Sequence, residues 1–298
     1  MTINQLCSSL DRSQQAYYQW LCRQGRKPKF QADVAQVINL VKYIRKKYLP
    51  GAGIRQVYNF VLSKPEYHDS IEGWSKHRYE RLCKEQGLII PIKRAYKGCT
   101  KKGDFQFDNL LKGKELNGIN QAFATDMFYV FSNTNGRKIG YCTTLMDLYS
   151  RYLLGLSFSS TMQAEHTSYE VMKQCLEVRD AASLEGCILH SDGAKQYIYQ
   201  PLLKLLGELN MVSSMATSCF ENSHAESLND ILKNHMLHGI VVNSIQQLKS
   251  QQEWLKKSYN CYRSHSSLGK LSPADYERMI ESVPICQRTI VKIYHPNG

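Results

Sequence analysis

The stretch Phe123-Ala-Thr-Asp-Met-Phe-Tyr-Val-Phe131 decides the fold class, because apolar and aromatic side chains dominate it and no turn residue interrupts it. This composition predicts a β-strand. Asp126 lies at its centre. A carboxylate in such surroundings is costly unless it is paired or bound to a metal ion. We therefore expect Asp126 to be functional.

The residues that follow predict more strands and then alternating helices and strands. Asn135-Gly136 is a strong hairpin signal. Strands are expected over 139–147, 152–158, 187–190 and 211–212, a loop over 214–222, and helices over 163–178, 199–207, 223–237 and 244–262. This order predicts an α/β fold, a ribonuclease-H-like mixed sheet with flanking helices on both faces. In that topology the strands that carry Asp126 and Asp192 are neighbours.

Two further acidic residues have recognisable settings. Asp192 lies in Leu-His-Ser-Asp-Gly at the end of a short strand, and Glu226 lies in Asn-Ser-His-Ala-Glu-Ser at the start of a helix. Together with Asp126 they form an all-oxygen ligand set, which Mg²⁺ or Mn²⁺ prefers. Two such ions can promote phosphoryl transfer. Asp126, Asp192 and Glu226 are therefore expected to be catalytic and to bind two metal ions.

Other interpretations of these acids remain open. Each aspartate, taken alone, could order a turn. Glu226 completes a capping-box pattern with Ser223 and could bond back to its amide. Glu221 and Asp230 are competing acids near Glu226. Asp147 is expected to order a turn together with Ser150 and Arg151 rather than to bind metal.

Lys233 shares one helix face with Glu226 and Asp230. It is expected either to contact the DNA backbone near the scissile phosphate or to be a surface lysine. His235 and His238 have no third soft ligand nearby, so we expect them to be structural or to face solvent.

The net charge of +12 lies entirely in the first part of the chain. Residues 1–118 hold 22 Lys and Arg against 10 Asp and Glu, whereas the rest of the chain is balanced. Such a surplus favours a polyanionic partner, although it could also serve solubility. Cations expected to bind DNA, or else to form a solvated face, are Arg78, Arg81, Lys84, Lys101 and Lys102.

Helical periodicity dominates this basic part. Two short helices over about 3–10 and 13–24, with Ser13 as N-cap, predict a helix-turn-helix, although an ordinary helical hairpin would have the same pattern. Further helices are expected over about 34–49, 53–63 and 74–86. The expected domains are an all-α helix-turn-helix DNA-binding region (1–92), a basic linker (93–118), a catalytic core with C-terminal helices (119–281) and a tail (282–298).

Membrane and secreted classes are not expected. The sequence shows no apolar run long enough to span a bilayer and no secretory signal, which predicts a cytoplasmic protein. Its 10 cysteines include no C-x-x-C pair and are expected to be mostly small buried hydrophobes.

Several ordered motifs together resemble one family. They are Leu6-Cys7 through Trp20, Asn109-Leu110-Leu111, Ala124-Thr125-Asp126, Asp147-Leu-Tyr-Ser-Arg151, His190-Ser-Asp192 with Gln196-Tyr197, Cys219 to Ser227, and Tyr259-Asn-Cys-Tyr-Arg-Ser-His265 with Ser272-Pro273-Ala274. The chain resembles an integrase-core (rve) DDE transposase of the OrfB type, from the IS-three insertion-sequence family of bacteria, within the retroviral integrase superfamily. It departs from the family pattern at Phe123, at Gly193-Ala194 and in a shortened loop before Cys219.

This resemblance implies a Mg²⁺-dependent polynucleotidyl transferase that cleaves transposon ends and catalyses strand transfer without a covalent protein–DNA intermediate. It implies double-stranded DNA as partner, both terminal inverted repeats and target DNA, a homo-oligomer on that DNA, and the upstream-frame product (OrfA) as a further partner. Arg263 and His265 are expected to contact DNA or to brace the core. The alternatives are a non-catalytic DNA-binding regulator of transposition and a structure-specific nuclease of the same fold.

Overall fold

The structure, a computed structural model, describes residues 3–10, 12–24, 29–91, 107–216 and 219–293. The centre of its larger part is a five-stranded sheet with strand order β4-β3-β2-β5-β6. The strands are β2 (Ala122–Phe131), β3 (Lys138–Asp147), β4 (Leu153–Ser159), β5 (Ile188–Ser191) and β6 (Val212–Met215). The first three form an antiparallel meander, β5 is parallel to β2, and β6 is parallel to β5. The expected ribonuclease-H-like mixed sheet is confirmed.

The register of the parallel pair β2–β5 sets the position of both aspartates. Ala124 is opposite His190 in this register. Asp126 and Asp192 each follow two residues later in the same direction, so the register brings them to the same level of the sheet.

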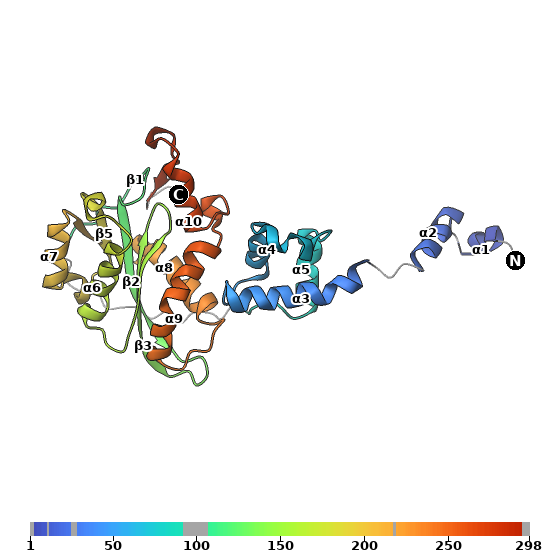
Figure 1. Cartoon of the computed structure of the whole chain (residues 1–298), viewed down its shortest axis with the longest axis horizontal. Coiled ribbons are helices and arrows are strands. Elements are labelled where there is room, and N and C mark those ends of the chain that lie inside the picture. Colours follow the sequence, from blue (N-terminus) through green and yellow to red (C-terminus); the bar gives the residue numbers. More distant parts are fainter. Residues whose placement is uncertain (1–2, 11, 25–28, 92–106, 217–218, 294–298) are drawn as a thin grey trace.

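Helices cover both faces of the sheet (Figure 1). On one side lie α6 (Ser168–Leu176) and α7 (Gln200–Glu208), and on the other α8 (Ser223–Asp230), α9 (Ile245–Lys257) and α10 (Pro273–Glu281). Side chains alternate between the faces along β2. Phe123 belongs to the α6–α7 cluster, whereas Ala124 and Phe128 belong to the α8–α10 cluster. Asp126 has the same parity as Ala124 and Phe128, so it faces α8.

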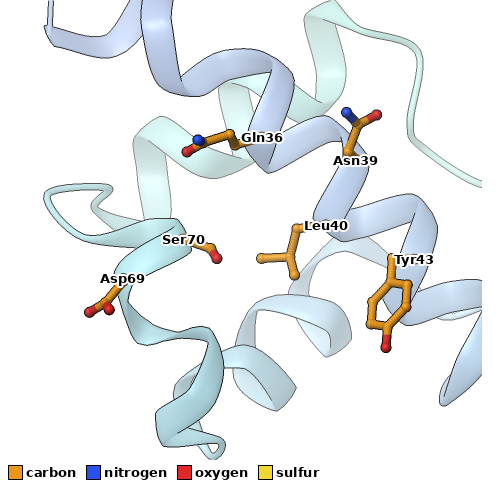
Figure 2. Close-up of a pocket in the computed structure, with 6 residues that line it drawn as sticks. All are labelled: Gln36, Asn39, Leu40, Tyr43, Asp69 and Ser70. Carbon is orange, nitrogen blue, oxygen red and sulfur yellow. The ribbon is translucent and has the colours of Figure 1, made fainter.

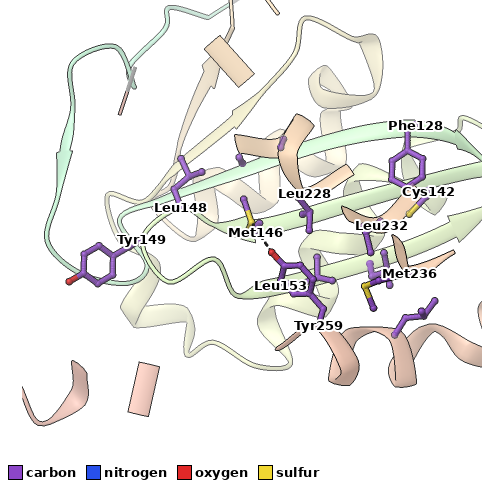
Figure 3. Packing of buried hydrophobic residues seen from close by; sticks show 14 of the residues in the cluster. Phe128, Cys142, Met146, Leu148, Tyr149, Leu153, Leu228, Leu232, Met236 and Tyr259 are labelled. Carbon is purple, nitrogen blue, oxygen red and sulfur yellow. Dashed lines mark hydrogen bonds between the residues drawn. The ribbon is translucent and has the colours of Figure 1, made fainter. Parts of the chain in front are cut away.

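The layer between the sheet and α8 is closely packed (Figure 3). Leu228 and Leu232 from the helix belong to the same buried cluster as Phe128 and Cys142 from the sheet, and all four are at most 4% exposed. Fully burying a side chain of this size stabilises the fold by about 1.5–3 kcal/mol. This packing fixes the helix that carries Glu226 against the strand that carries Asp126.

Two of the expected helices change their winding before they end. The α-helix α8 stops at Asp230 and continues as a π-helix, η6 (Ile231–Met236). Likewise α9 continues as the π-helix η7 (Ser258–Tyr262). The sequence therefore predicts the extent of both helices but not this local unwinding, which recurs at functional sites in proteins.

The expected loop 214–222 is partly wrong, because β6 extends through Met215 and a 3₁₀ turn, η5, covers Cys219–Asn222. Ser214 can end a buried strand because its hydroxyl is satisfied there. Its Oγ accepts the backbone N–H of Leu110 at 2.9 Å and lies 2.9 Å from Nδ1 of His190. A buried hydroxyl with these two hydrogen-bond partners is stable within the strand.

The basic N-terminal part is helical, as expected. Its elements are α1 (Ile3–Ser9), α2 (Gln14–Gln24), α3 (Lys29–Lys47), α4 (Ile54–Leu62), η1 (Pro65–Ile71) and α5 (Lys76–Glu85). Ser13 caps α2, since its Oγ accepts the N–H of Ala16 at 3.1 Å. Helices α3 to α5 have a core of their own, which includes Val41, Val57 and Tyr79.

Direct non-covalent contacts hold this helical unit against the sheet-containing part. Trp254 Nε1 donates to the carbonyl of Lys47 at 3.2 Å, and Gln56 Nε2 donates to the carbonyl of Ser264 at 2.6 Å. Gly51 and Gly239 also lie against one another across this boundary. A Cβ at Gly51 would lie 1.5 Å from the carbonyl oxygen of His235, and one at Gly239 would lie 1.9 Å from the nitrogen of Gly51. The α3–α4 turn thus rests on the end of the helix that carries Glu226.

A second, two-stranded sheet pairs β1 (Glu115–Leu116) with β7 (Val291–Lys292). Leu111 and Leu116, from the expected linker, are fully buried in the core cluster beside α10. The domain boundaries remain a prediction. Short 3₁₀ turns complete the described chain: η2 (Ala164–His166), η3 (Ala181–Leu184), η4 (Lys195–Ile198), η8 (Ser266–Leu268) and η9 (Ile285–Gln287).

Two further features of the described residues are the apolar character of the helices and the burial of the cysteines. Within the described ranges no helix has both the length and the apolar character needed to cross a bilayer. Most of the cysteines that the structure describes are buried thiols, namely Cys7, Cys83, Cys142, Cys175 and Cys187.

Gly51→Ala is expected to lower the free energy of unfolding by more than about 2 kcal/mol. Its methyl group would overlap the backbone of His235, and alanine disfavours the φ of 62° found there. Urea unfolding of the full chain measures this change. The control is Gly53→Ala, where no atom lies within 4 Å of the new Cβ, and it should cost less than about 1 kcal/mol. Equal losses in the two variants would contradict the close contact.

Candidate active site

Asp126 and Asp192 lie together where β2 and β5 run side by side. Asp126 Oδ1 accepts the N–H of Met127 at 2.8 Å, and Asp192 Oδ1 accepts the N–H of Ala194 at 3.2 Å. Both side chains belong to half-buried residues. The two-strand arrangement expected from the sequence is therefore present.

The electrostatics of this pair are unfavourable without a counter-ion. Burial, followed by the charge of Asp192, raises the pKa of Asp126 to about 7, against the opposing effects of the Met127 N–H and Lys233. Burial also raises the pKa of Asp192. Two desolvated carboxylates that repel one another form a site that favours either a proton or a cation.

Glu226 is exposed in the first turn of α8. The capping-box alternative is not what forms, because the residue at the N-cap is Asn222 and no side chain caps this helix. The charge of Glu226 also raises the pKa of Asp126, though less than burial and the charge of Asp192 do. Among the described residues no three His, Cys, Asp or Glu side chains form a group that could hold a metal ion.

Asn229 is a site residue that sequence reasoning missed. Its Nδ2 donates to Asp126 Oδ2 at 2.6 Å, and Asn229 is only 4% exposed. Thr144 Oγ1 donates to Asn229 Oδ1 at 3.4 Å, which orients the amide. The available signal was its position, since a polar residue three positions after Glu226 lies on the inward face of the same helix. A buried amide there requires a polar partner.

Lys233 lies on the π-helix beside the same site. Its Nζ is 4.6 Å from the centroid of the Phe128 ring. Burial lowers the pKa of Lys233, while Asp126 is the largest of the charges that raise it. The competing acid Asp230 is engaged elsewhere, because its Oδ1 accepts Nδ2 of Asn234 at 2.5 Å.

His190 is a second missed residue, and it links the pair to the surrounding loops. Its Nε2 lies 3.0 Å from the carbonyl oxygen of Glu221, and Nδ1 lies 2.9 Å from Ser214 Oγ. Nε2 must therefore carry the ring proton, because a carbonyl can only accept. Burial lowers the pKa of His190 to about 4, so the ring stays neutral. This residue ties the strand before Asp192 to the turn before α8.

Asp147 orders a turn, as expected. Its Oδ2 accepts the N–H of Asn120 at 2.7 Å, and Oδ1 accepts those of Tyr149 at 2.8 Å and Ser150 at 3.0 Å. Arg151, at the end of this turn, reaches α8 instead. Its Nη1 lies 2.7 Å from Nδ1 of His224.

The remaining expected DNA-binding residues lie in three places. Arg263 and His265 are half-buried on the α8 side of the sheet, where the His265 ring centroid is 5.1 Å from that of Tyr259. Residues of α5 lie in the separate helical unit (Figure 1), where Arg81 Nε is 3.7 Å from Glu85 and the Arg78 guanidinium is 5.6 Å from the Trp74 ring centroid. Lys84 is exposed on the same helix. Lys101 and Lys102 lie outside the described residues.

A larger, open hollow of about 570 Å³ lies in the helical unit (Figure 2). Its described lining combines neutral side chains from α3 with Asp69 and Ser70 from η1. Asp69 is the only charged group in that lining, and the hollow contains neither aspartate of the pair. It therefore does not form part of the candidate active site.

Comparison with known proteins shows what this chain is similar to. Residues 211–273 match the model of the integrase core domain. Over 283 residues the chain is 24% identical to the insertion element IS600 uncharacterized 31 kDa protein of Shigella sonnei, covering 91% of this chain and 97% of that protein. It is 28% identical over 163 residues to the transposase InsF for insertion sequence IS3A of Escherichia coli, and the match spans 54% of each.

A solved structure of the HTLV-2 integrase catalytic core domain in complex with magnesium matches 57% of this chain and 99% of its own, at 14% identity and a TM-score of 0.37. The segment that matches the integrase core domain, residues 211–273, includes α8 and Glu226. The chain is similar to insertion-sequence transposases, as its motifs predicted, and it matches about half the length of the InsF proteins.

Asp126→Asn is expected to stabilise the metal-free protein at alkaline pH. The pKa of Asp126 is about 7 in the folded state against 3.8 for the unperturbed group. The native state therefore binds the extra proton between these values, and its stability falls as pH rises from about 4 to 7. The variant does not titrate, so it should gain about 2–3 kcal/mol relative to the wild type between pH 5 and pH 8.

Thermal unfolding in a metal chelator at both pH values measures this difference. Asp180→Asn is the matched control, because Asp180 is exposed, and its stability relative to the wild type should not change with pH. An Asp126→Asn protein that is less stable than the wild type at pH 8 would contradict the repulsion.

Proposed function

We propose that this chain is the transposase of a bacterial insertion sequence, which cleaves the ends of its element and joins them to target DNA. The observation that supports this proposal most strongly is the desolvated pair Asp126–Asp192 beside a helix that carries Glu226 and Lys233. A protein that only binds DNA has no reason to bury two like charges together, because their repulsion costs stability. The substrate would be a phosphodiester bond in double-stranded DNA.

The chemistry of the carboxylates fits divalent cations. Asp126 and Asp192 would hold Mg²⁺ or Mn²⁺, because a hard cation offsets both the burial and the repulsion by Asp192 that raise the pKa of Asp126. Glu226 would complete the ligand set from α8, and the three carboxylates would bind two ions. When bound, these ions supply Lewis acidity that activates the attacking oxygen and stabilises the leaving oxygen.

The protein's own side chains would position the reacting groups. Asn229 holds Oδ2 of Asp126 and so keeps the carboxylate in one orientation. The Lys233 ammonium, near Asp126 and over Phe128, would bind an oxygen of the DNA backbone next to the scissile phosphate. His190 would keep Asp192 and the turn before α8 at a fixed separation.

Two successive phosphoryl transfers follow from this arrangement. Water would attack the phosphodiester at a transposon end, forming one P–O bond and breaking another, so that a 3′-OH leaves. That hydroxyl would then attack a phosphodiester of target DNA and release a new 3′-OH. Each step exchanges one P–O bond for another, so no covalent protein–DNA intermediate and no further co-reactant is needed.

The excess positive charge of residues 1–118 would bind the terminal inverted repeats. The phosphate contacts would come from Arg78, Arg81 and Lys84 on α5 and from Lys101 and Lys102 later in the sequence. Such a protein would act as a homo-oligomer on paired DNA ends in the bacterial cytoplasm, with the upstream-frame product (OrfA) as a further partner. Arg263 and His265, which lie on the α8 side of the sheet, would contact DNA or brace the catalytic core.

A non-catalytic regulator of transposition is the second candidate. It is favoured by one observation, namely that no three acidic or other ligating side chains among the described residues are arranged around a metal position. In that case the two aspartates would be a remnant, and DNA would be bound but not cut.

Glu226→Gln is expected to lower cleavage of DNA that carries the ends of the element by more than about 100-fold, because even outer partners of a metal site cost about 10–100-fold when removed. DNA binding should be unchanged. The measurement incubates full-length protein, Mg²⁺ and end-labelled DNA, and separates nicked from joined products. Glu221→Gln and Asp230→Asn are matched controls that should keep wild-type rates.

In the same assay, the products formed by the wild-type protein distinguish between the candidate functions. Nicked and joined products support the transposase, nicked products alone indicate a nuclease, and binding without cleavage, even after addition of the upstream-frame product, indicates the regulator. A Glu226→Gln protein that cleaves at the wild-type rate would remove Glu226 from the active site.

A further inference from the structure

A small, partly open cavity of about 170 Å³ lies between α8, the Asp147 turn and the segment after η7. Its apolar wall consists of Met146, Leu228, Ile231 and Tyr259, of which Figure 3 labels Met146, Leu228 and Tyr259 among the packed residues. The rest of its described lining is polar, and the lining contains no carboxylate. These polar residues are Arg151, His224, Ser227, His265 and Ser267. We call this set the basic pocket.

Arg151 reaches the basic pocket because of its backbone. Its φ of 61° lies in the left-handed region, which is unusual for a residue other than glycine. This conformation follows the turn that Asp147 orders and directs the guanidinium to His224, whose Nδ1 is 2.7 Å from Arg151 Nη1. An arginine can only donate, so Nδ1 accepts and His224 carries its ring proton on Nε2.

His265 contributes a polar atom that the fold does not satisfy. Within the part of the chain that the structure describes, its Nε2 is buried without a hydrogen-bond partner. A buried polar atom left in this state costs about 1–3 kcal/mol. Its place in the wall of a polar cavity indicates that a ligand or water satisfies it.

The charge of the basic pocket is positive and uncompensated by its own lining. Burial, together with the cations Arg263 and Arg151, lowers the pKa of His265 to about 3, so this ring is neutral at physiological pH. The guanidinium of Arg151 stays charged. The pocket offers N–H donors, hydroxyls and one cation, which together suit a small anion.

We propose that the basic pocket binds one tetrahedral phosphate group, and that in the working complex this group is a backbone phosphodiester of the DNA strand that is cut. The assignment to DNA rests on the proposed function, whereas binding of a phosphate group does not. The volume equals that of about six water molecules, which accommodates one such group. Arginine binds phosphate with two parallel hydrogen bonds, and the ring and hydroxyl donors surround the remaining oxygens.

The location connects this phosphate to the chemistry. His224 and Ser227 flank Glu226 in the first turns of α8. A phosphate held between them would fix the DNA strand relative to the helix that carries Glu226, on the opposite side from Lys233. Arg151 and His265 are positioning residues in this account, because they hold the strand and do not touch the reacting atoms.

The test uses the full chain without metal and two probes, inorganic phosphate and a short DNA duplex. NMR follows the ring resonances of His224 and His265 during each titration. Phosphate should shift both rings in the wild type, and the duplex should shift the same rings and displace the phosphate. Arg151→Gln should weaken phosphate binding by at least about tenfold, as expected for loss of a charged hydrogen-bond donor.

Matched variants separate the basic pocket from general charge effects. Arg137→Gln removes an exposed cation at the β2–β3 turn and should leave the phosphate affinity within about twofold. If Arg151→Gln does not fold, Arg151→Lys, which keeps the charge but loses the planar fork, should still bind phosphate several-fold more weakly. His265→Gln should likewise weaken it.

Absence of any ring shift with either probe would overturn the proposal. Phosphate binding that the duplex does not displace would overturn its assignment to DNA. Failure of the proposed function is distinguishable, because a wild-type protein that binds both probes at His224 and His265 but never cleaves DNA with Mg²⁺ would retain the phosphate site and exclude the transposase.

Discussion

The parallel pairing of β5 with β2 is the constraint on which the candidate active site depends. Its register places His190 opposite Ala124, and this alone brings Asp126 and Asp192 to one level of the sheet, although 65 residues separate them in sequence. Their proximity has a cost, because each carboxylate is shielded from water and the charge of Asp192 raises the pKa of Asp126. The α8 layer compensates in part, since Asn229 donates to Asp126 and Lys233 brings a positive charge nearby.

The same constraint explains why the helix carrying Glu226 is held from several sides. Leu228 and Leu232 pack it onto the sheet, His190 ties the preceding turn to β5, and Gly51 from the helical unit contacts its far end at Gly239. Arg151 adds a contact with His224 in its first turn. These contacts fix the helix backbone while the Glu226 side chain stays exposed. The arrangement suits a carboxylate that completes its ligand set only when cations and DNA are present.

Much of the fold follows from local pattern. The apolar run around Asp126, the Asn135-Gly136 turn and the helical periodicities predict the strands and helices to within a few residues, because binary pattern and turn chemistry act locally. The site is harder to derive. The sequence identifies Asp126 and Asp192 and places them together through topology, but the capping-box alternative for Glu226 could be dismissed only once Asn222 was seen at the N-cap. Asn229 and His190 were missed because their roles depend on partners 103 and 31 residues away, Asp126 and Glu221.

The central claim is that Asp126 and Asp192 form a cation site, in which a bound divalent ion relieves the repulsion between the two carboxylates. Calorimetric titration of the metal-free full chain with Mg²⁺, at pH 7 in buffers of different ionisation enthalpy, tests it most directly. With the pKa of Asp126 at about 7, roughly half of the molecules hold a proton there, so binding should release about half a proton per chain. Asp192→Asn should lose both the binding and the proton release. Binding that releases no proton, or that survives Asp192→Asn unchanged, would contradict the account.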